Sequence, residues 1–108
     1  MNHDHDPRHP VTIAKTILHQ IGVNTLMCIG SHDRTVVNPS GDFLGGVTFR
    51  ITPNPKMKQH GRVTVLLNGT DTYHVKIETC RGKVLLDKND IYADNLGGPS
   101  GVIEGITG

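Results

Sequence analysis

Aromatic residues and cysteines are scarce in this chain of 108 residues. Tryptophan is absent, and phenylalanine and tyrosine occur twice each. A domain of this length has room for one modest core, which must therefore be built from Val, Ile and Leu. The two cysteines, Cys28 and Cys80, are too few for a disulfide framework. We expect both thiols to be reduced and mostly buried.

Strong charge and long apolar runs are also lacking. The net charge is +1 with histidines neutral, so whole-molecule electrostatics favours no class of partner. No apolar run approaches the roughly 20 residues of a membrane helix. The first residues have neither the basic start nor the apolar centre of a signal peptide. The sequence therefore predicts a cytoplasmic protein without membrane contact.

The clearest structural signal is a β-hairpin around Asn68-Gly69, a dipeptide that tolerates positive φ. Apolar and polar residues alternate on both sides of it, which predicts one buried and one exposed face. A two-residue loop would place core residues opposite solvent-facing residues. We therefore predict an odd connection of three or five residues, with Val65 facing Tyr73, Val63 facing Val75, and Gly69 in a left-handed conformation.

Between Pro10 and Gly22, apolar residues recur at the spacing of one helix face. This pattern predicts an amphipathic helix over residues 11–21. Alternation over residues 47–52 predicts a strand. The sum is an α+β domain: one N-terminal helix packed on a mainly antiparallel sheet of four or five strands, with a short C-terminal helical turn. We divide the chain into a disordered His/Asp-rich arm (1–9), this single domain (10–96) and a Gly-rich tail (97–108).

Three local segments are less regular. The apolar run of residues 25–30 predicts a buried strand. Gly45-Gly46 precedes a strand and is interpreted as a turn. Asn89 or Asp90 is a potential N-cap for the helical turn, which we expect over residues 91–96.

Several segments resemble small uncharacterised proteins of phages and prophages. The matching pieces are Thr16-Ile17-Leu18-His19-Gln20-Ile21-Gly22, Asn24-Thr25-Leu26-Met27, Gly30, Asp71-Thr72-Tyr73 with Val75, and Tyr92-Ala93-Asp94-Asn95-Leu96. Similar proteins continue the last motif into a longer helix, whereas this chain has glycines and a proline over residues 97–101. The resemblance implies an accessory protein of the bacterial cytoplasm and carries over no site residue.

The sharpest chemical motif is His3 at the third position, where it and a free α-amine can bind Cu²⁺ or Ni²⁺ in a square plane. We interpret such binding as adventitious, because the arm lacks the fixed surroundings of metal sites. Cysteine and histidine elsewhere lack zinc-ligand spacing. A convergence of Cys28, Cys80, His32 and His60 in the fold stays open.

Catalysis has little support in the sequence. Cys80 with His74 or His60 would be the simplest nucleophile–base pair, but a six-residue separation on one strand keeps His74 remote. A nucleophile elbow, a phosphate-binding loop and a zinc-protease motif are absent. We predict a non-enzymatic protein without a cofactor.

Basic residues supply the best binding hypothesis. If their strands and loops adjoin, they form a local positive patch that contacts a protein or nucleic-acid phosphates. The patch would consist of Arg50, Lys56, Lys58, His60, Arg62, Lys76, Arg81 and Lys83.

We therefore expect a protein-binding accessory or inhibitor protein, which docks by a sheet edge or by the loop at 53–62. The alternative is a nucleic-acid-binding protein, although an aromatic platform is missing. Exposed strand edges also allow a homodimer.

Overall fold

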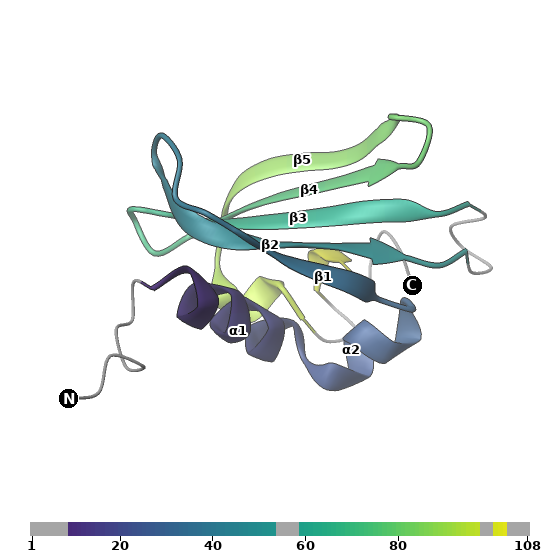
Figure 1. Cartoon of the computed structure of the whole chain (residues 1–108), viewed down its shortest axis with the longest axis horizontal. Coiled ribbons are helices and arrows are strands. Elements are labelled where there is room, and N and C mark those ends of the chain that lie inside the picture. The colour runs from purple at the N-terminus through teal and green to yellow at the C-terminus, as the bar shows by residue number, and fades with distance from the viewer. Residues whose placement is uncertain (1–8, 54–58, 98–100, 104–108) are drawn as a thin grey trace.

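The computed structural model describes residues 9–53, 59–97 and 101–103. In this part of the chain the complete elements are two helices, five strands and a short 3₁₀ helix (Figure 1). Their bounds are α1 (Pro10–Ile21), α2 (Val23–Cys28), β1 (His32–Val37), β2 (Phe43–Ile51), β3 (Gly61–Asn68), β4 (Tyr73–Thr79), β5 (Val84–Ile91) and η1 (Ala93–Asn95). The predicted α+β class is confirmed, since α1 packs on a five-stranded antiparallel sheet in the order β1-β2-β3-β4-β5 and a helical turn follows β5.

Helix α1 forms where its sequence predicts. Pro10 occupies the first turn, where its missing N–H is harmless, and the His9 side chain accepts a hydrogen bond from the Val11 amide at 3.2 Å. The helix buries Ile13, Ala14 and Ile17 against the sheet. His9 thus serves as the helix N-cap and is the described end of the predicted arm.

The prediction of a strand over residues 25–30 is wrong, because these residues lie mostly in α2. The burial pattern is helical: Thr25, Leu26 and Ile29 are buried, whereas Met27 is 74% exposed. In a strand, Thr25, Met27 and Ile29 would lie on one face and share one degree of exposure, which they do not. Short apolar runs satisfy both periods, and here packing beside α1 decides for the helix.

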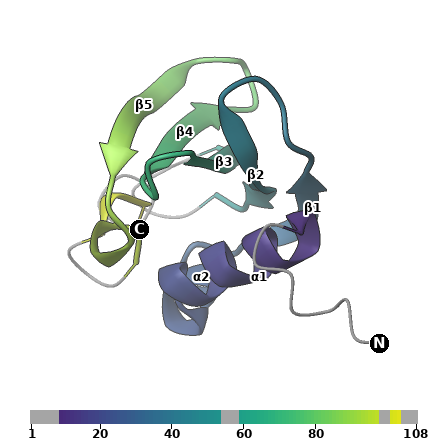
Figure 2. The ribbon, with the colours of Figure 1, turned by 90° about the vertical axis from the view of Figure 1, so that its left-hand side faces the viewer.

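The sheet separates the molecule into two faces (Figure 2). Helices α1 and α2 lie under one face, called the inner face, and no helix of the described residues covers the opposite, outer face. Alternate residues of the central strands point inward and are completely buried, as in the predicted pattern. The core they form is completed by η1 and the residues after it, since Leu96 and Ile103 are also fully buried.

The β3–β4 hairpin confirms the predicted odd connection. Leu67 and Tyr73 form the last pair of the ladder, so five residues lie between them. The predicted partners are wrong by two positions, because Val65 pairs with Val75 and Val63 pairs with Ile77.

The left-handed residue of this hairpin is Asp71, with φ of 62°, and not Gly69 as predicted. The Asn68 side chain organises the loop by accepting hydrogen bonds from the Thr70 and Thr72 amides at 3.0 and 3.4 Å. With the loop held in this way, the residue with positive φ is Asp71, one position before Thr72. Aspartate tolerates the left-handed region better than most residues.

The prediction of a turn at Gly45-Gly46 is wrong. Both glycines are buried inside β2. A β-carbon on Gly46 would overlap the carbonyl oxygen of Val65 on the neighbouring strand. The two glycines therefore permit a close approach of backbones, a role that a strand glycine often has.

The C-terminal helical turn also begins later than predicted. Asn89 and Asp90 belong to β5, and the turn spans Ala93–Asn95 without a side-chain cap. Asp90 has a positive φ of 59°, which marks an irregularity near the end of this edge strand. A tight turn joins β4 to β5, with Gly82 at φ of 86°.

Candidate functional site

The outer face carries a row of charged and titratable side chains across four neighbouring strands. His32 of β1 pairs with Arg50 of β2, Arg50 pairs with Arg62 of β3, and Arg62 pairs with Glu78 of β4. Paired residues of an antiparallel ladder point to the same side, so all four side chains share the outer face. The register thus assembles residues that lie 46 positions apart in the chain, from 32 to 78.

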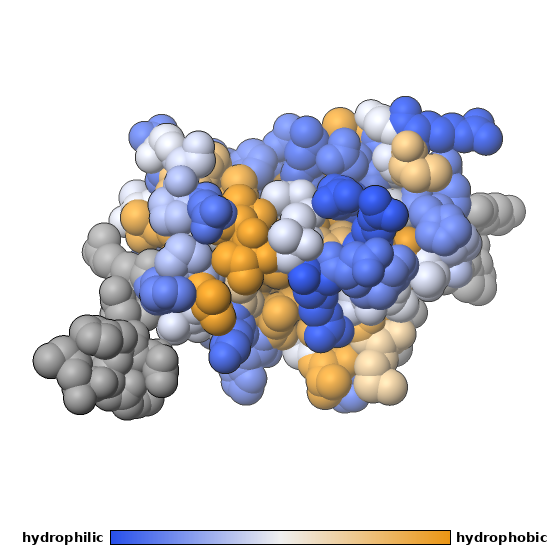
Figure 3. Space-filling model, in the orientation of Figure 1, coloured by the Kyte–Doolittle hydropathy of each residue, from blue (hydrophilic) through white to orange (hydrophobic). Residues whose placement is uncertain are grey.

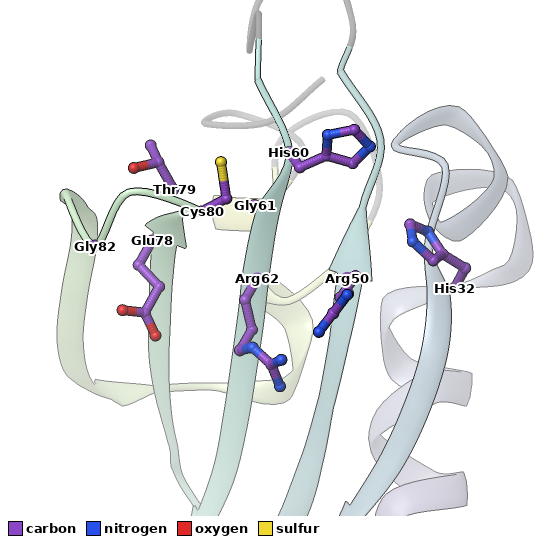
Figure 4. Close-up of a pocket in the computed structure, with 9 residues that line it drawn as sticks. All are labelled: His32, Arg50, His60, Gly61, Arg62, Glu78, Thr79, Cys80 and Gly82. Atoms are coloured by element: carbon purple, nitrogen blue, oxygen red, sulfur yellow. The ribbon is translucent and has the colours of Figure 1, made fainter.

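A pocket of about 610 Å³ opens where this row meets the ends of the strands (Figure 4). This volume lies within the range of roughly 300–1,000 Å³ that is typical of ligand sites. We call it the basic pocket. Its lining residues are His32, Arg50, His60, Gly61, Arg62, Glu78, Thr79, Cys80 and Gly82.

The two arginines are the unusual part of the basic pocket. They are direct cross-strand partners, a placement that brings Cα atoms to about 4.5–5.5 Å and is unfavourable for like charges. The described ion pairs, His32–Asp33 at 4.0 Å and His74–Asp87 at 2.7 Å, involve neither arginine.

The positions of the guanidinium groups differ. The Arg62 Nη1 atom donates to Thr48 Oγ1 at 3.5 Å, which draws this side chain towards β2 and away from Glu78 on β4. No hydrogen bond or ion pair joins Arg50 to another described residue, and its side chain is exposed. The donors of Arg50 are therefore available to a ligand.

The predicted basic patch is assembled only in part. Arg50, His60 and Arg62 line the basic pocket, and the exposed Arg81 and Lys83 flank Gly82 at its rim. Lys76 lies on the same outer face beyond Glu78, opposite Thr64 of β3. Lys56, Lys58 and the predicted copper ligand His3 lie outside the described residues.

Sequence reasoning did not place three members of the basic pocket. His32 begins β1, a few residues after the run that we predicted as a strand and that is helical. Glu78 is one of the polar residues that alternate along the hairpin, but its position beside Arg62 depends on the register. Cys80 is exposed, contrary to the expectation of a mostly buried thiol, because it lies just beyond the end of β4.

Cysteine and histidine do converge here, although not as a recognisable metal or nucleophilic centre. Cys80, His32 and His60 all line the pocket, and the Cys80 amide donates to the His60 carbonyl at 2.9 Å. In the described part of the chain, no three His, Cys, Asp or Glu side chains are grouped closely enough to hold a metal ion. The Cys28 side chain lies outside the described part.

His74 lies further along β4, away from the basic pocket. Its Nε2 atom contacts Asp87 of β5 at 2.7 Å, and its ring packs edge-on against Phe43 with ring centroids 5.7 Å apart. The buried Nδ1 atom has no hydrogen-bond partner among the described residues. These contacts fix the ring within the outer face and keep it remote from Cys80.

A second exposed feature is apolar. Figure 3 shows apolar surface at the position of α2, where Val23 and Met27 are 66% and 74% exposed. These residues are four positions apart on a six-residue helix and so lie on one side of it.

The edges of the sheet are less regular than its centre. The β1 ladder is interrupted between His32 and Thr35, where Asp33 has a positive φ of 53°. The β5 ladder contains two register shifts, and Asp90 has a positive φ there. Irregularity and charge on edge strands discourage the addition of a further strand.

Comparisons with known proteins give no information on the function of the basic pocket. No protein-family model, no curated protein and no solved structure matches this chain. Within the described residues, the helices are too short or too polar to cross a membrane.

Proposed function

We propose that this protein is a small non-enzymatic binding module that docks on a protein partner through the basic pocket and the outer face around it. The observation that carries the proposal is the cross-strand pair Arg50–Arg62, which has no acidic partner among the described residues. Such a pair lowers the stability of an isolated sheet. A partner that supplies negative charge would offset this cost.

The mixed charge of the outer face favours a protein over a nucleic acid. Glu78 lines the pocket itself, and Asp87 lies on the neighbouring strand β5. Both would repel a phosphate backbone. Base stacking also finds little support at the pocket, because its described lining contains no Phe, Tyr or Trp side chain. Nucleic-acid binding therefore remains the alternative function.

The face of the sheet, not its edge, is the docking surface in this proposal. The irregular β1 and β5 edges oppose strand addition, whereas the row of side chains across four strands is not covered by either described helix, α1 or α2. The resemblance to phage and prophage proteins supports an accessory or inhibitory role on a protein of the bacterial cytoplasm.

The test is an affinity capture from bacterial lysate, run with and without nuclease. The wild type is compared with Arg50→Glu/Arg62→Glu, and with a control double variant, Lys15→Glu/Lys88→Glu. The control makes the same change in net charge at exposed positions outside the pocket. We expect a stoichiometric protein that survives nuclease, is retained by the control and is lost with the arginine variant.

Two results would contradict the proposal. Equal capture by both double variants would show that the basic pocket is not the docking surface. Recovery of nucleic acid, with affinity that falls steeply as salt is raised, would support the alternative instead.

A further inference from the structure

The charges in the basic pocket restrict the kind of anion that it can hold. Among the lining residues, Arg50 and Arg62 contribute two positive charges and Glu78 contributes one negative charge, which sums to +1 when histidines are counted neutral and the rim residues are left out. A carboxylate carries one negative charge and balances this sum. A phosphate monoester carries about −1.5 to −2 at neutral pH and would exceed it.

The geometry also suits a carboxylate. Arg50 and Arg62 are direct partners in the ladder, and the contact of Arg62 with Thr48 turns its guanidinium towards the strand that bears Arg50. Figure 4 shows both side chains extending over the same part of the sheet. A carboxylate placed between the two side chains can accept charge-assisted hydrogen bonds from both guanidinium groups.

Glu78 adds selectivity to this arrangement. It lies opposite Arg62 on the next strand but is not within ion-pair distance of it. Its carboxylate is thus close enough to repel a second negative charge on a ligand without neutralising the arginines. The pocket should therefore accept an anion whose single negative charge is shared by two oxygens, as in a carboxylate.

We infer that the basic pocket binds one carboxylate of the partner between Arg50 and Arg62, and that Glu78 selects against phosphate. This inference rests on the proposed function, because it names the group by which the partner is recognised. The carboxylate belongs either to an acidic side chain or to the C-terminus of the partner chain. The pocket volume leaves room for the residue that carries it.

Binding of short peptides to the purified full-length protein tests the inference. Four probes of otherwise equal sequence are compared: one with a glutamate and an amidated C-terminus, one with a free C-terminus, one with phosphoserine and one without charge. Chemical-shift changes in ¹⁵N-labelled protein report both the affinity and the location. We expect a carboxylate probe to shift the amides of Arg50, Gly61 and Arg62, and whichever carboxylate binds more tightly identifies its source.

Variants make the assignment specific. Losing one charge-assisted hydrogen-bonding group should weaken carboxylate binding by roughly 10- to 100-fold in Arg50→Gln. The control Lys88→Gln should bind as the wild type does. Glu78→Gln should strengthen binding of the phosphoserine probe more than binding of the carboxylate probes.

Several outcomes would overturn the inference. They are unchanged carboxylate affinity in Arg50→Gln, absence of carboxylate binding, and tighter binding of the phosphoserine probe by the wild type. Capture of a partner through the arginines with no carboxylate binding would refute the inference and leave the proposed function intact. Carboxylate binding without any captured partner would support the pocket assignment and refute the proposed function.

Discussion

The two faces of the sheet are built from the same strands but follow different rules. On the inner face, alternate residues such as Phe49, Val63 and Val75 are fully buried. On the outer face, their neighbours Arg50, Arg62 and His74 remain wholly or partly accessible. The inner face is satisfied by packing alone, whereas the outer face leaves like charges side by side and a polar nitrogen of His74 unpaired among the described residues.

This difference indicates where stability and where binding reside. A buried apolar side chain contributes to stability through transfer and packing, and its removal leaves a cavity. An exposed charge contributes little, and a like-charge pair opposes folding slightly. Substitutions on the inner face should therefore change the free energy of unfolding, and substitutions on the outer face should change binding.

The largest effect is expected at Phe49, which is fully buried at the centre of the inner face. Phe49→Ala should lower the free energy of unfolding by about 3–5 kcal/mol, because it removes a large side chain from the core. Thr48→Ala on the outer face removes hydrogen bonds to Val63 and Thr64 and should cost only about 1 kcal/mol. Urea denaturation of both variants measures the contrast, and similar losses would contradict the division between the faces.

The next largest loss of stability is expected at Gly46, where the backbones of β2 and β3 approach closely. In Gly46→Ala the new methyl group would overlap the Val65 carbonyl, so β2 and β3 must separate locally at a cost of about 1–3 kcal/mol. Gly69→Ala is the matched control, since nothing lies within 4 Å of its β-carbon and its φ is not positive. Thermal unfolding of the two variants should differ clearly, and an equal Tm would refute the role of Gly46.

The inner face could largely be predicted from the sequence, and the basic pocket could not. Strict alternation marked the inward residues of β2, β3 and β4, because one buried face imposes a period of two. The predicted partners across the hairpin were two positions off, since parity alone does not choose the residue on which the turn is centred. Asn68 makes that choice through its side-chain hydrogen bonds to the loop.

The basic pocket depends on information that alternation does not contain. Arg50, His60 and Arg62 were identifiable as basic residues, but their placement in one pocket with His32 and Glu78 follows from the register across four strands. His32 was not placed, because the preceding apolar run was interpreted as a strand. Its helical packing against α1 shifts the start of the sheet to His32 itself.

At the hairpin, the inner face meets the solvent, and a dependence on pH should follow. Burial, and to a lesser degree the negative charge of Asp71, raise the pKa of Tyr73 above its ordinary value of 10.0. The unfolded chain therefore loses this proton at a lower pH than the folded protein does. The resulting stabilisation is complete below about pH 10 and is lost as pH rises through the folded-state pKa.

Denaturation of the wild type and of Tyr73→Phe, measured between about pH 8 and 11, isolates this contribution. The wild type should lose stability above about pH 10 more steeply than the variant. Tyr92→Phe is the control, because Tyr92 is 65% exposed. Parallel pH profiles for the wild type and Tyr73→Phe would show that Tyr73 does not titrate differently in the two states.

The smallest effect on stability is expected at the arginine pair, and its sign matters more than its size. Arg50→Gln removes one of two like charges that face each other across the ladder, so it should raise the free energy of unfolding by about 0.5 kcal/mol or less. At about 1 M salt, where the Debye length is about 3 Å, the gain should disappear.

Lys88→Gln removes the same charge from an exposed position on β5 and should give no such gain. If Arg50→Gln instead lowers the free energy of unfolding by more than about 1 kcal/mol, Arg50 supports the fold, and the reason to assign it to a ligand is gone. A gain in stability together with a loss of binding would show that the inner face determines stability and that the outer face serves binding. The outer face would then retain a charge that opposes folding because the partner requires it.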